Sequence, residues 1–157
     1  MNDSEDTQMI GIGSDHGGFP LKEEIKKHLD EIGVAYKDYG TDSPESCDYP
    51  IYAEAVARAV VSGEVEKGIL ICGTGIGISI AANKVKGIRA ALCGDCYSAE
   101  YTRRHNDANI LTMGARVTGG GLACKIVDTF LTTEFEGGRH ARRVALIADI
   151  EEREREN

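Results

Sequence analysis

The sequence contains no hydrophobic run long enough to cross a membrane. A transmembrane helix needs about 20 consecutive apolar residues, whereas hydrophobic residues are 41% of this 157-residue chain and polar residues interrupt them throughout. The opening Met-Asn-Asp-Ser-Glu-Asp-Thr-Gln is acidic and lacks the basic and apolar regions of a signal peptide. We therefore expect a cytoplasmic protein that has no membrane partner.

Positive charge and a regular cysteine framework are also lacking. The 18 Lys and Arg residues face 26 Asp and Glu residues, and the net charge of −8 argues against general nucleic-acid binding. Five cysteines, an odd number, fit reduced thiols in the cytosol. Internal repeats and linkers are absent, so we expect one domain over 9–157, preceded by a disordered acidic extension at 1–8.

Short β-rich runs alternate with amphipathic segments along the whole chain. This alternation predicts an α/β fold, a three-layer αβα Rossmann-like sandwich whose five-stranded parallel sheet is covered on both faces. In the last helix, Val144, Ile147 and Ile150 are expected to face inward. The expected strands are 9–14, 34–39, 68–72, 88–93 and 109–113, and the expected helices are 20–32, 51–61, 76–85, 98–105, 121–132 and 140–155.

The most informative segment is the glycine-rich turn that follows the third expected strand. Cys72 ends that strand, and the carboxyl ends of strands are where open α/β sheets bind ligands. Glycines at 73, 75 and 77 allow backbone N–H groups to approach an anion, and such donors favour a thiolate. Alternatively, Cys72 is a small hydrophobic residue that ends a core strand.

Asp15 and His16 follow the first expected strand directly, so they belong to the same edge of the sheet as Cys72. The right-handed crossover rule allows the first and third strands to be neighbours at a switch point, which is a preferred ligand site. The alternative is a simple turn in which Asp15 caps the next helix.

Two further polar segments supply candidate residues. His105 suits proton transfer and Asn106 can donate to a developing oxyanion, although the same residues also suit a polar helix C-terminus. Arg139 and Arg143 are four residues apart on the last helix, where they form either a phosphate clamp or mere surface charge. Arg116 is another candidate cation.

Two other chemistries are weaker interpretations of the same sequence. Cys93 and Cys96 have the spacing of a redox or metal pair, but no second ligand pair accompanies them. The glycine turn also suggests dinucleotide binding, with Asp95 about twenty residues downstream, but Ile78 occupies the place of the third glycine.

Taken together, these segments resemble the type B ribose-5-phosphate isomerases, in the family that includes galactose- and allose-6-phosphate isomerases. The likeness runs from about residue 10 to residue 150. It is carried by Ser-Asp-His-Gly-Gly-Phe, Asp-Tyr-Pro, Ile-Cys-Gly-Thr-Gly-Ile-Gly-Ile-Ser-Ile-Ala-Ala-Asn-Lys, Gly-Ile-Arg-Ala-Ala, Arg-His-Asn-Asp-Ala-Asn and Gly-Gly-Arg-His-Ala-Arg-Arg-Val. The resemblance implies interconversion of ribose 5-phosphate and ribulose 5-phosphate through a cis-enediolate, in the pentose phosphate pathway, without a metal or organic cofactor.

The resemblance also implies roles for individual residues. Cys72 would be the base that moves the proton between C1 and C2, and His105 would assist ring opening. The remaining roles concern binding: Gly73, Thr74, Gly75, Ile76, Gly77 and Asn106 would hold the oxyanion, Asp15 and Thr74 would contact the hydroxyls and ring oxygen, and His16, Arg139 and Arg143 would hold the phosphate with Arg116 nearby.

Departures and agreements within the family refine this expectation. One branch uses a later glutamate as base, but the corresponding residue here is Ile78, which leaves Cys72 as the base. The His105–Asn106 pair favours a five-carbon substrate, with a six-carbon sugar phosphate or a non-catalytic nucleotide-binding module as alternatives. The family implies a homodimer, or a dimer of dimers, with active sites shared between subunits.

Overall fold

The computed structural model describes residues 8–156, so all but the last residue of the expected acidic extension at 1–8 lies outside the described part. Eleven elements follow one another along the chain. In order they are β1 (Met9–Ser14), α1 (Phe19–Ile32), β2 (Ala35–Asp38), α2 (Tyr49–Ser62), β3 (Lys67–Cys72), α3 (Ile76–Ala82), β4 (Ala90–Leu92), α4 (Cys96–Asn106), β5 (Ile110–Gly114), α5 (Gly120–Thr132) and α6 (Arg139–Glu156). Every expected strand and helix is present, with ends shifted by a few residues.

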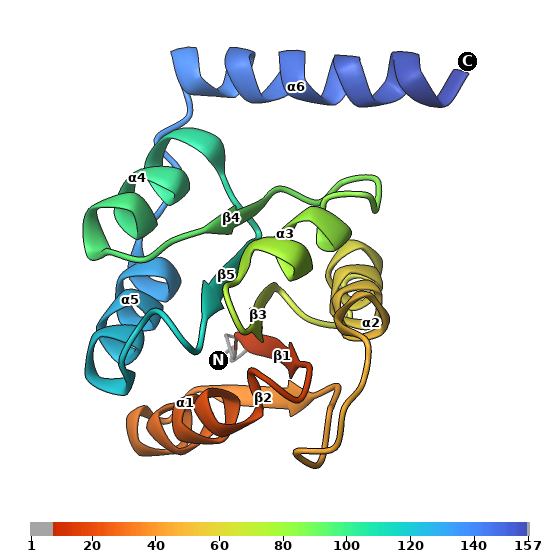
Figure 1. The fold of residues 1–157 in the computed structure, drawn as a ribbon. Coiled ribbons are helices and arrows are strands. Elements are labelled where there is room, and N and C mark those ends of the chain that lie inside the picture. The colour runs from red at the N-terminus through yellow and green to blue at the C-terminus, as the bar shows by residue number, and fades with distance from the viewer. Residues whose placement is uncertain (1–7, 157) are drawn as a thin grey trace.

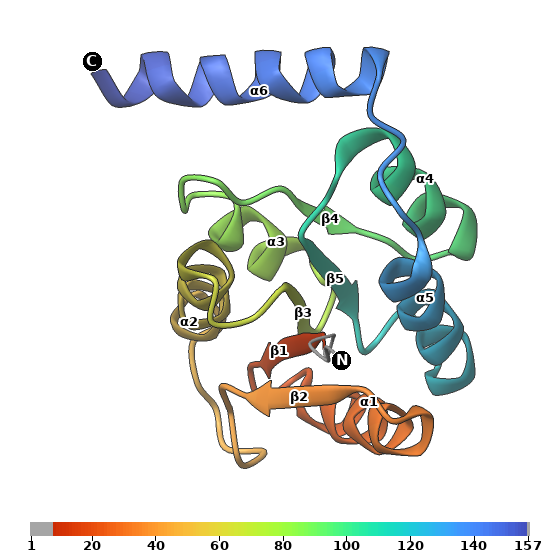
Figure 2. The same ribbon diagram turned by 180° about the vertical axis from the view of Figure 1, so that it is seen from behind.

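The five strands form one parallel sheet in the order β2-β1-β3-β5-β4. Helices α1, α4 and α5 cover one face and α2 and α3 cover the other (Figures 1 and 2). Alternate residues of β3 therefore enter different cores: Ile69 and Ile71 pack on the first side, and Leu70 and Cys72 on the second. The predicted three-layer αβα architecture is confirmed.

The neighbouring strands β1 and β3 form the switch point of the sheet, because their following helices lie on opposite faces. Ser14 pairs with Ile71 at the carboxyl end of this ladder. A side chain at Gly18 would collide with the Ile71 carbonyl, so the turn after β1 needs glycine to pass this close to β3. The chain thus brings the segments after β1 and β3 together.

Helix α6 lies apart from the rest of the molecule (Figure 1): it packs beside α4 at its start, and further along Glu151 and Glu152 bond to Gly87 and Lys86 in the loop before β4. The expectation that Val144, Ile147 and Ile150 are inside the core is wrong for the single chain. Ile147 is 50% exposed and Ile150 is 53% exposed. These residues line one wall of an open groove of about 710 Å³ whose other wall includes the loop before β4. Within residues 8–156, none of the helices combines the length and apolar character that a membrane span requires.

Candidate active site

Cys72 lies at the carboxyl end of β3, as the sequence predicts. Its residue is 5% exposed, so the sulfur lies at the edge of the core and is not wholly enclosed. The N–H of Gly75 donates to its Sγ at 3.2 Å. Gly75 has φ of 82°, the left-handed region in which glycine is strongly favoured, and this conformation turns the amide back toward the sulfur.

The rest of the glycine turn is open to the outside. Thr74 is exposed, and its Oγ1 accepts the N–H of Ile76 at 3.2 Å. The N–H groups of Gly73 and Thr74 have no acceptor among residues 8–156. Unpaired donors beside a thiol suit a ligand oxygen that carries negative charge. Gly77 is the second residue of α3 and lies against the ring of Tyr49.

Asp15 and His16 lie beside this turn. Asp15 is 7% exposed and its Oδ1 accepts the N–H of Gly18 at 3.0 Å, which closes the turn after β1; the N-cap of α1 is Gly18 itself, so Asp15 does not cap the helix. His16 accepts the N–H of Cys47 at Nδ1, 3.1 Å away. That bond requires an unprotonated Nδ1, so a neutral His16 carries its proton on Nε2.

Arg116 completes the cluster at the carboxyl edge. Its Nη1 lies 3.1 Å from where a Cβ on Gly73 would be, so the guanidinium rests directly over the start of the turn. Arg116 is exposed and pairs with no carboxylate of residues 8–156. A free guanidinium over a turn of free amides is suited to hold an anion.

The remaining candidate residues form a second cluster at the end of α4 and the start of α6. His105 and Asn106 are the last two residues of α4. His105 stacks on His140 with ring centroids 4.0 Å apart. This contact joins the end of α4 to the first turn of α6. That helix carries Arg139 at its first position and Arg143 one turn later, and both are exposed.

The two clusters lie at opposite edges of the sheet in the single chain. Cys72 pairs with Gly114, whereas Gly68 pairs with Ile110 at the other end of the same ladder. Asn106 precedes Ile110, so at ~3.3 Å per residue the two edges are about 13 Å apart. The structure thus brings together Asp15, His16, Arg116 and the turn with Cys72, but it does not bring them to His105, Asn106, Arg139 and Arg143.

One group of side chains has the composition of a metal site. His105, Glu136 and His140 offer three ligand atoms within 4.8 Å of one another. However, the two imidazole planes differ by only 8°, so their in-plane lone pairs run side by side and do not converge on one ion. Glu136 Oε1 instead lies 3.8 Å from His105 Nε2 and 3.4 Å from His140 Nε2, an ion-pair distance from either ring when that ring is protonated.

The weaker interpretations find little support in the surroundings of their residues. Cys93 is 1% exposed, and burial raises the pKa of its thiol to about 11, which disfavours redox exchange with Cys96. Asp95 caps α4 by accepting the N–H of Ser98 at 2.6 Å. Ile78 is fully buried, so no proton acceptor replaces Cys72 at that point of the helix.

Several residues of these clusters were missed by sequence reasoning. Tyr49 belongs to the matching segment Asp-Tyr-Pro but is not predicted as a site residue, and its ring covers Gly77. Glu136 and His140 lie in the same segment as Arg139 and Arg143, but only the arginines are predicted from the sequence as ligands. Glu136 lies in the loop before α6 and His140 lies within α6, so helical spacing gives no signal for their contact.

Known proteins resemble this chain both in sequence and in three-dimensional structure. Residues 10–147 match the family model described as Ribose/Galactose Isomerase. The chain is 58% identical over 144 residues to ribose-5-phosphate isomerase B of Escherichia coli, which covers 92% of this chain and 97% of that protein. A ribose-5-phosphate isomerase B structure from Clostridium thermocellum superposes with a TM-score of 0.92 at 58% identity, covering 93% of this chain and 99% of that one. The enzyme of Mycoplasma genitalium, solved with bound ribulose-5-phosphate, has a TM-score of 0.87 at 42% identity and covers 92% and 96%.

Proposed function

Because the chain belongs to the ribose/galactose isomerase family, we propose that it interconverts D-ribose 5-phosphate and D-ribulose 5-phosphate with Cys72 as the base. The observation that carries this proposal is the position of Cys72 Sγ. It lies at the sheet switch point, receives the Gly75 N–H and adjoins two unpaired backbone donors. A proton α to a carbonyl is only weakly acidic, so its removal needs both a base and donors for the developing oxyanion.

The reaction is an exchange of protons within the sugar. Cys72 Sγ, as thiolate, takes the proton from C2 of the open-chain aldose, and the electron pair of that bond passes through C1 to the carbonyl oxygen. The resulting cis-enediolate receives the proton back at C1 from the thiol, while the hydroxyl proton of O2 is transferred to O1. The Gly75 N–H stabilises negative charge on the sulfur, and the N–H groups of Gly73 and Thr74 stabilise it on the enediolate.

The remaining groups open and hold the substrate. Asp15 and Thr74 bind hydroxyl groups, and His105 transfers a proton between the ring oxygen and the anomeric hydroxyl, while Asn106 donates to the oxyanion. His16, Arg139 and Arg143 hold the phosphate, with Arg116 beside them. A phosphate held far from the reacting carbons supplies binding energy that orients C1 and C2 against Sγ.

The direct test is turnover of ribose 5-phosphate in the presence of a chelator. We expect product formation by the unmodified protein, loss of activity in Cys72→Ala and near-normal activity in Cys96→Ala, a matched cysteine outside the cluster. In D2O the product should carry deuterium at C1 to the extent that the Cys72 thiol exchanges with solvent before it returns the proton. Activity that persists in Cys72→Ala would refute the assignment of the base. Preference for a six-carbon sugar phosphate over ribose 5-phosphate would instead revise the substrate.

We further propose that a second copy of the chain completes each site, as a homodimer or a dimer of dimers. The separation of the two clusters in one chain supports this arrangement, since Cys72 and His105 have to reach the same sugar. The exposed apolar side chains of α6, among them Leu146, Ile147 and Ile150, supply surface that a neighbour can bury.

Mixing two inactive variants tests the shared site. In a mixed dimer of Cys72→Ala and His105→Ala chains, one site carries both substitutions and the other carries neither. Statistical exchange of subunits should therefore restore up to about a quarter of the normal activity. Mixed dimers that form but stay inactive would show that each chain builds its own site.

A further inference from the structure

The residue that follows the His105–Asn106 pair has an unusual backbone. Asp107 has φ of 49°, and it is the only non-glycine residue with a positive φ among residues 8–156. This left-handed conformation is unfavourable for most residues with a side chain, although Asp adopts it more readily than most. It ends α4 at Asn106 and turns the chain into β5, with the N–H of Ala108 donating to the Thr102 carbonyl at 3.1 Å.

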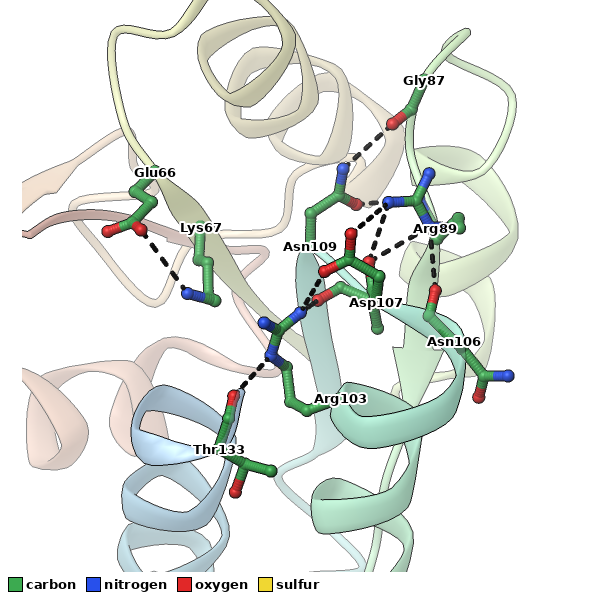
Figure 3. Close-up of polar contacts among 10 residues, drawn as sticks. Glu66, Lys67, Gly87, Arg89, Arg103, Asn106, Asp107, Asn109 and Thr133 are labelled. Atoms are coloured by element: carbon green, nitrogen blue, oxygen red, sulfur yellow. Dashed lines mark hydrogen bonds and ion pairs between the residues drawn. The ribbon is translucent and has the colours of Figure 1, made fainter. Parts of the chain in front are cut away.

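Two guanidinium groups hold this turn from either side (Figure 3). Arg89 donates from Nε to the Asn106 carbonyl at 3.0 Å and from Nη2 to the Asp107 carbonyl at 2.9 Å. Arg103 donates from Nη1 to Asp107 Oδ1 at 2.9 Å and to the Ala108 carbonyl at 2.7 Å. Together they satisfy carbonyl groups that the end of a helix leaves without partners.

Both arginines are themselves anchored to other elements. The backbone N–H of Arg89 donates to Asn109 Oδ1 at 2.8 Å, which fixes it where β4 begins beside β5. The Arg103 side chain is 8% exposed, and its Nε donates to the Thr133 carbonyl after α5 at 3.1 Å. The Asp107 carboxylate lies 2.9 Å from Arg103 Nη1 and 3.4 Å from Arg89 Nη2, while nearby Lys67 pairs with Glu66 at 3.8 Å (Figure 3).

We call the hydrogen bonds of Arg89 and Arg103 to the turn at Asp107 the arginine clamp. This clamp holds the backbone of Asn106 and leaves the Asn106 side chain free. The Asn106 carboxamide is exposed, points away from the arginines in Figure 3 and makes no hydrogen bond to residues 8–156. Its neighbour His105 has a side chain that is 38% exposed. A fixed backbone that carries an unpaired carboxamide is the arrangement that precise presentation to a ligand requires.

From these contacts we infer that Arg89 and Asp107 are positioning residues for His105 and Asn106. They touch no substrate; they fix the end of α4 so that the imidazole and the carboxamide meet the sugar held by Cys72 of a second copy. The inference rests on the proposed function, and it assigns the clamp a role in rate rather than in substrate affinity.

Substitution of Arg89 tests this role by separating kcat from KM. We expect Arg89→Ala to lower kcat about 10- to 100-fold, with KM changed by less than about threefold because Arg89 holds none of the phosphate ligands. Arg89→Lys retains a cationic donor and serves as the test if the alanine variant does not fold. Its kcat should lie between those of the unmodified protein and Arg89→Ala. Arg58→Ala, in an exposed pair with Glu54, serves as the control and should leave both constants unchanged. A folded Arg89 variant with normal kcat would overturn the inference.

Three substitutions of Asp107 separate its side chain from its backbone. Asp107→Asn tolerates the left-handed conformation and keeps one acceptor, so its kcat should stay within about threefold of normal. Asp107→Gly adopts the conformation without strain but lacks the acceptor, and its kcat should fall as in Arg89→Ala. Asp107→Ala should lose most because it lacks both. Normal kcat in Asp107→Gly would show that the carboxylate positions nothing.

Mixed dimers distinguish failure of this inference from failure of the proposed function. If the sites are shared, mixing Arg89→Ala chains with Cys72→Ala chains should restore activity as fully as mixing His105→Ala chains with Cys72→Ala chains. In each mixed dimer both substitutions then fall in one site and the other site is intact. If only the mixture of His105→Ala with Cys72→Ala regains activity, the shared site stands and the proposed role of Arg89 is wrong. If neither pair restores activity, the shared site is wrong, and the inference is overturned with it.

Discussion

The imidazole rings of His105 and His140 lie face to face, with centroids 4.0 Å apart and planes inclined by only 8°. Glu136 lies beside both rings: its Oε1 is 3.8 Å from Nε2 of His105 and 3.4 Å from Nε2 of His140. Burial lowers the pKa of His140, and the neighbouring His105 and Arg139 lower it further, against the opposing effect of Glu136. The folded protein therefore favours a neutral His140 against the His105 ring.

The first prediction is that His140 makes the fold less stable in acid. With its pKa lowered, the folded state binds fewer protons than the unfolded state once the pH falls below about 6.5. The free energy of unfolding should then decrease from pH 7.5 to pH 5.5 more steeply in the unmodified protein than in His140→Gln. Denaturant titrations at the two pH values measure the difference. Equal slopes in both proteins would contradict a neutral buried imidazole.

The second prediction concerns the pair of Lys22 and Asp38, which joins α1 to the end of β2. Lys22 is fully buried and its Nζ lies 2.6 Å from Asp38 Oδ2. Asp38→Asn leaves that ammonium without its carboxylate, so we expect a loss of about 3–5 kcal/mol in the free energy of unfolding. Lys22→Met removes the buried charge itself and leaves Asp38 with Lys26 at 2.8 Å, so it should cost less.

Acid should weaken the same pair. Burial raises the pKa of Asp38, but hydrogen bonds from Lys22, Lys26 and the Gly40 N–H outweigh it and hold the pKa below its ordinary value. Its contribution is therefore present above about pH 4 and is lost as the pH falls further. Glu54→Gln, in an exposed pair with Arg58, should change stability by less than about 1 kcal/mol and is the matched control. Equal losses in Asp38→Asn and Glu54→Gln would refute the buried-pair explanation.

The sequence predicts the fold and the carboxyl-edge cluster because both depend on local signals. Hydrophobic runs and glycine at turns define the strands; Cys72 ends one of them and Asp15 directly follows another. The insertion of β5 between β3 and β4 depends on packing between distant segments, which no local pattern records. The same limit applies to the clamp on Asp107, since Arg89 is 18 residues away in the chain.

The third prediction is that Cys93 does not react as a redox thiol. Burial raises its pKa to about 11, so at pH 8 almost none of it is thiolate. Brief treatment with iodoacetamide should modify half-buried Cys47 and Cys96 and leave Cys93 unmodified, as mass spectrometry of peptides can show. A Cys93–Cys96 disulfide isolated from air-oxidised, folded protein would favour the redox interpretation instead.

The fourth prediction tests the phosphate clamp on α6. Arg139 and Arg143 are one turn apart and both exposed, so their guanidinium groups can grip one phosphate. Arg139→Ala should cost about 2–4 kcal/mol of transition-state stabilisation, most of it as a higher KM for ribose 5-phosphate. Arg58→Ala, in an exposed pair with Glu54 on α2 and outside both clusters, should change KM little. Steady-state kinetics of the two variants decide the matter, and an Arg139→Ala effect confined to kcat would assign this arginine to the reacting carbons rather than to the phosphate.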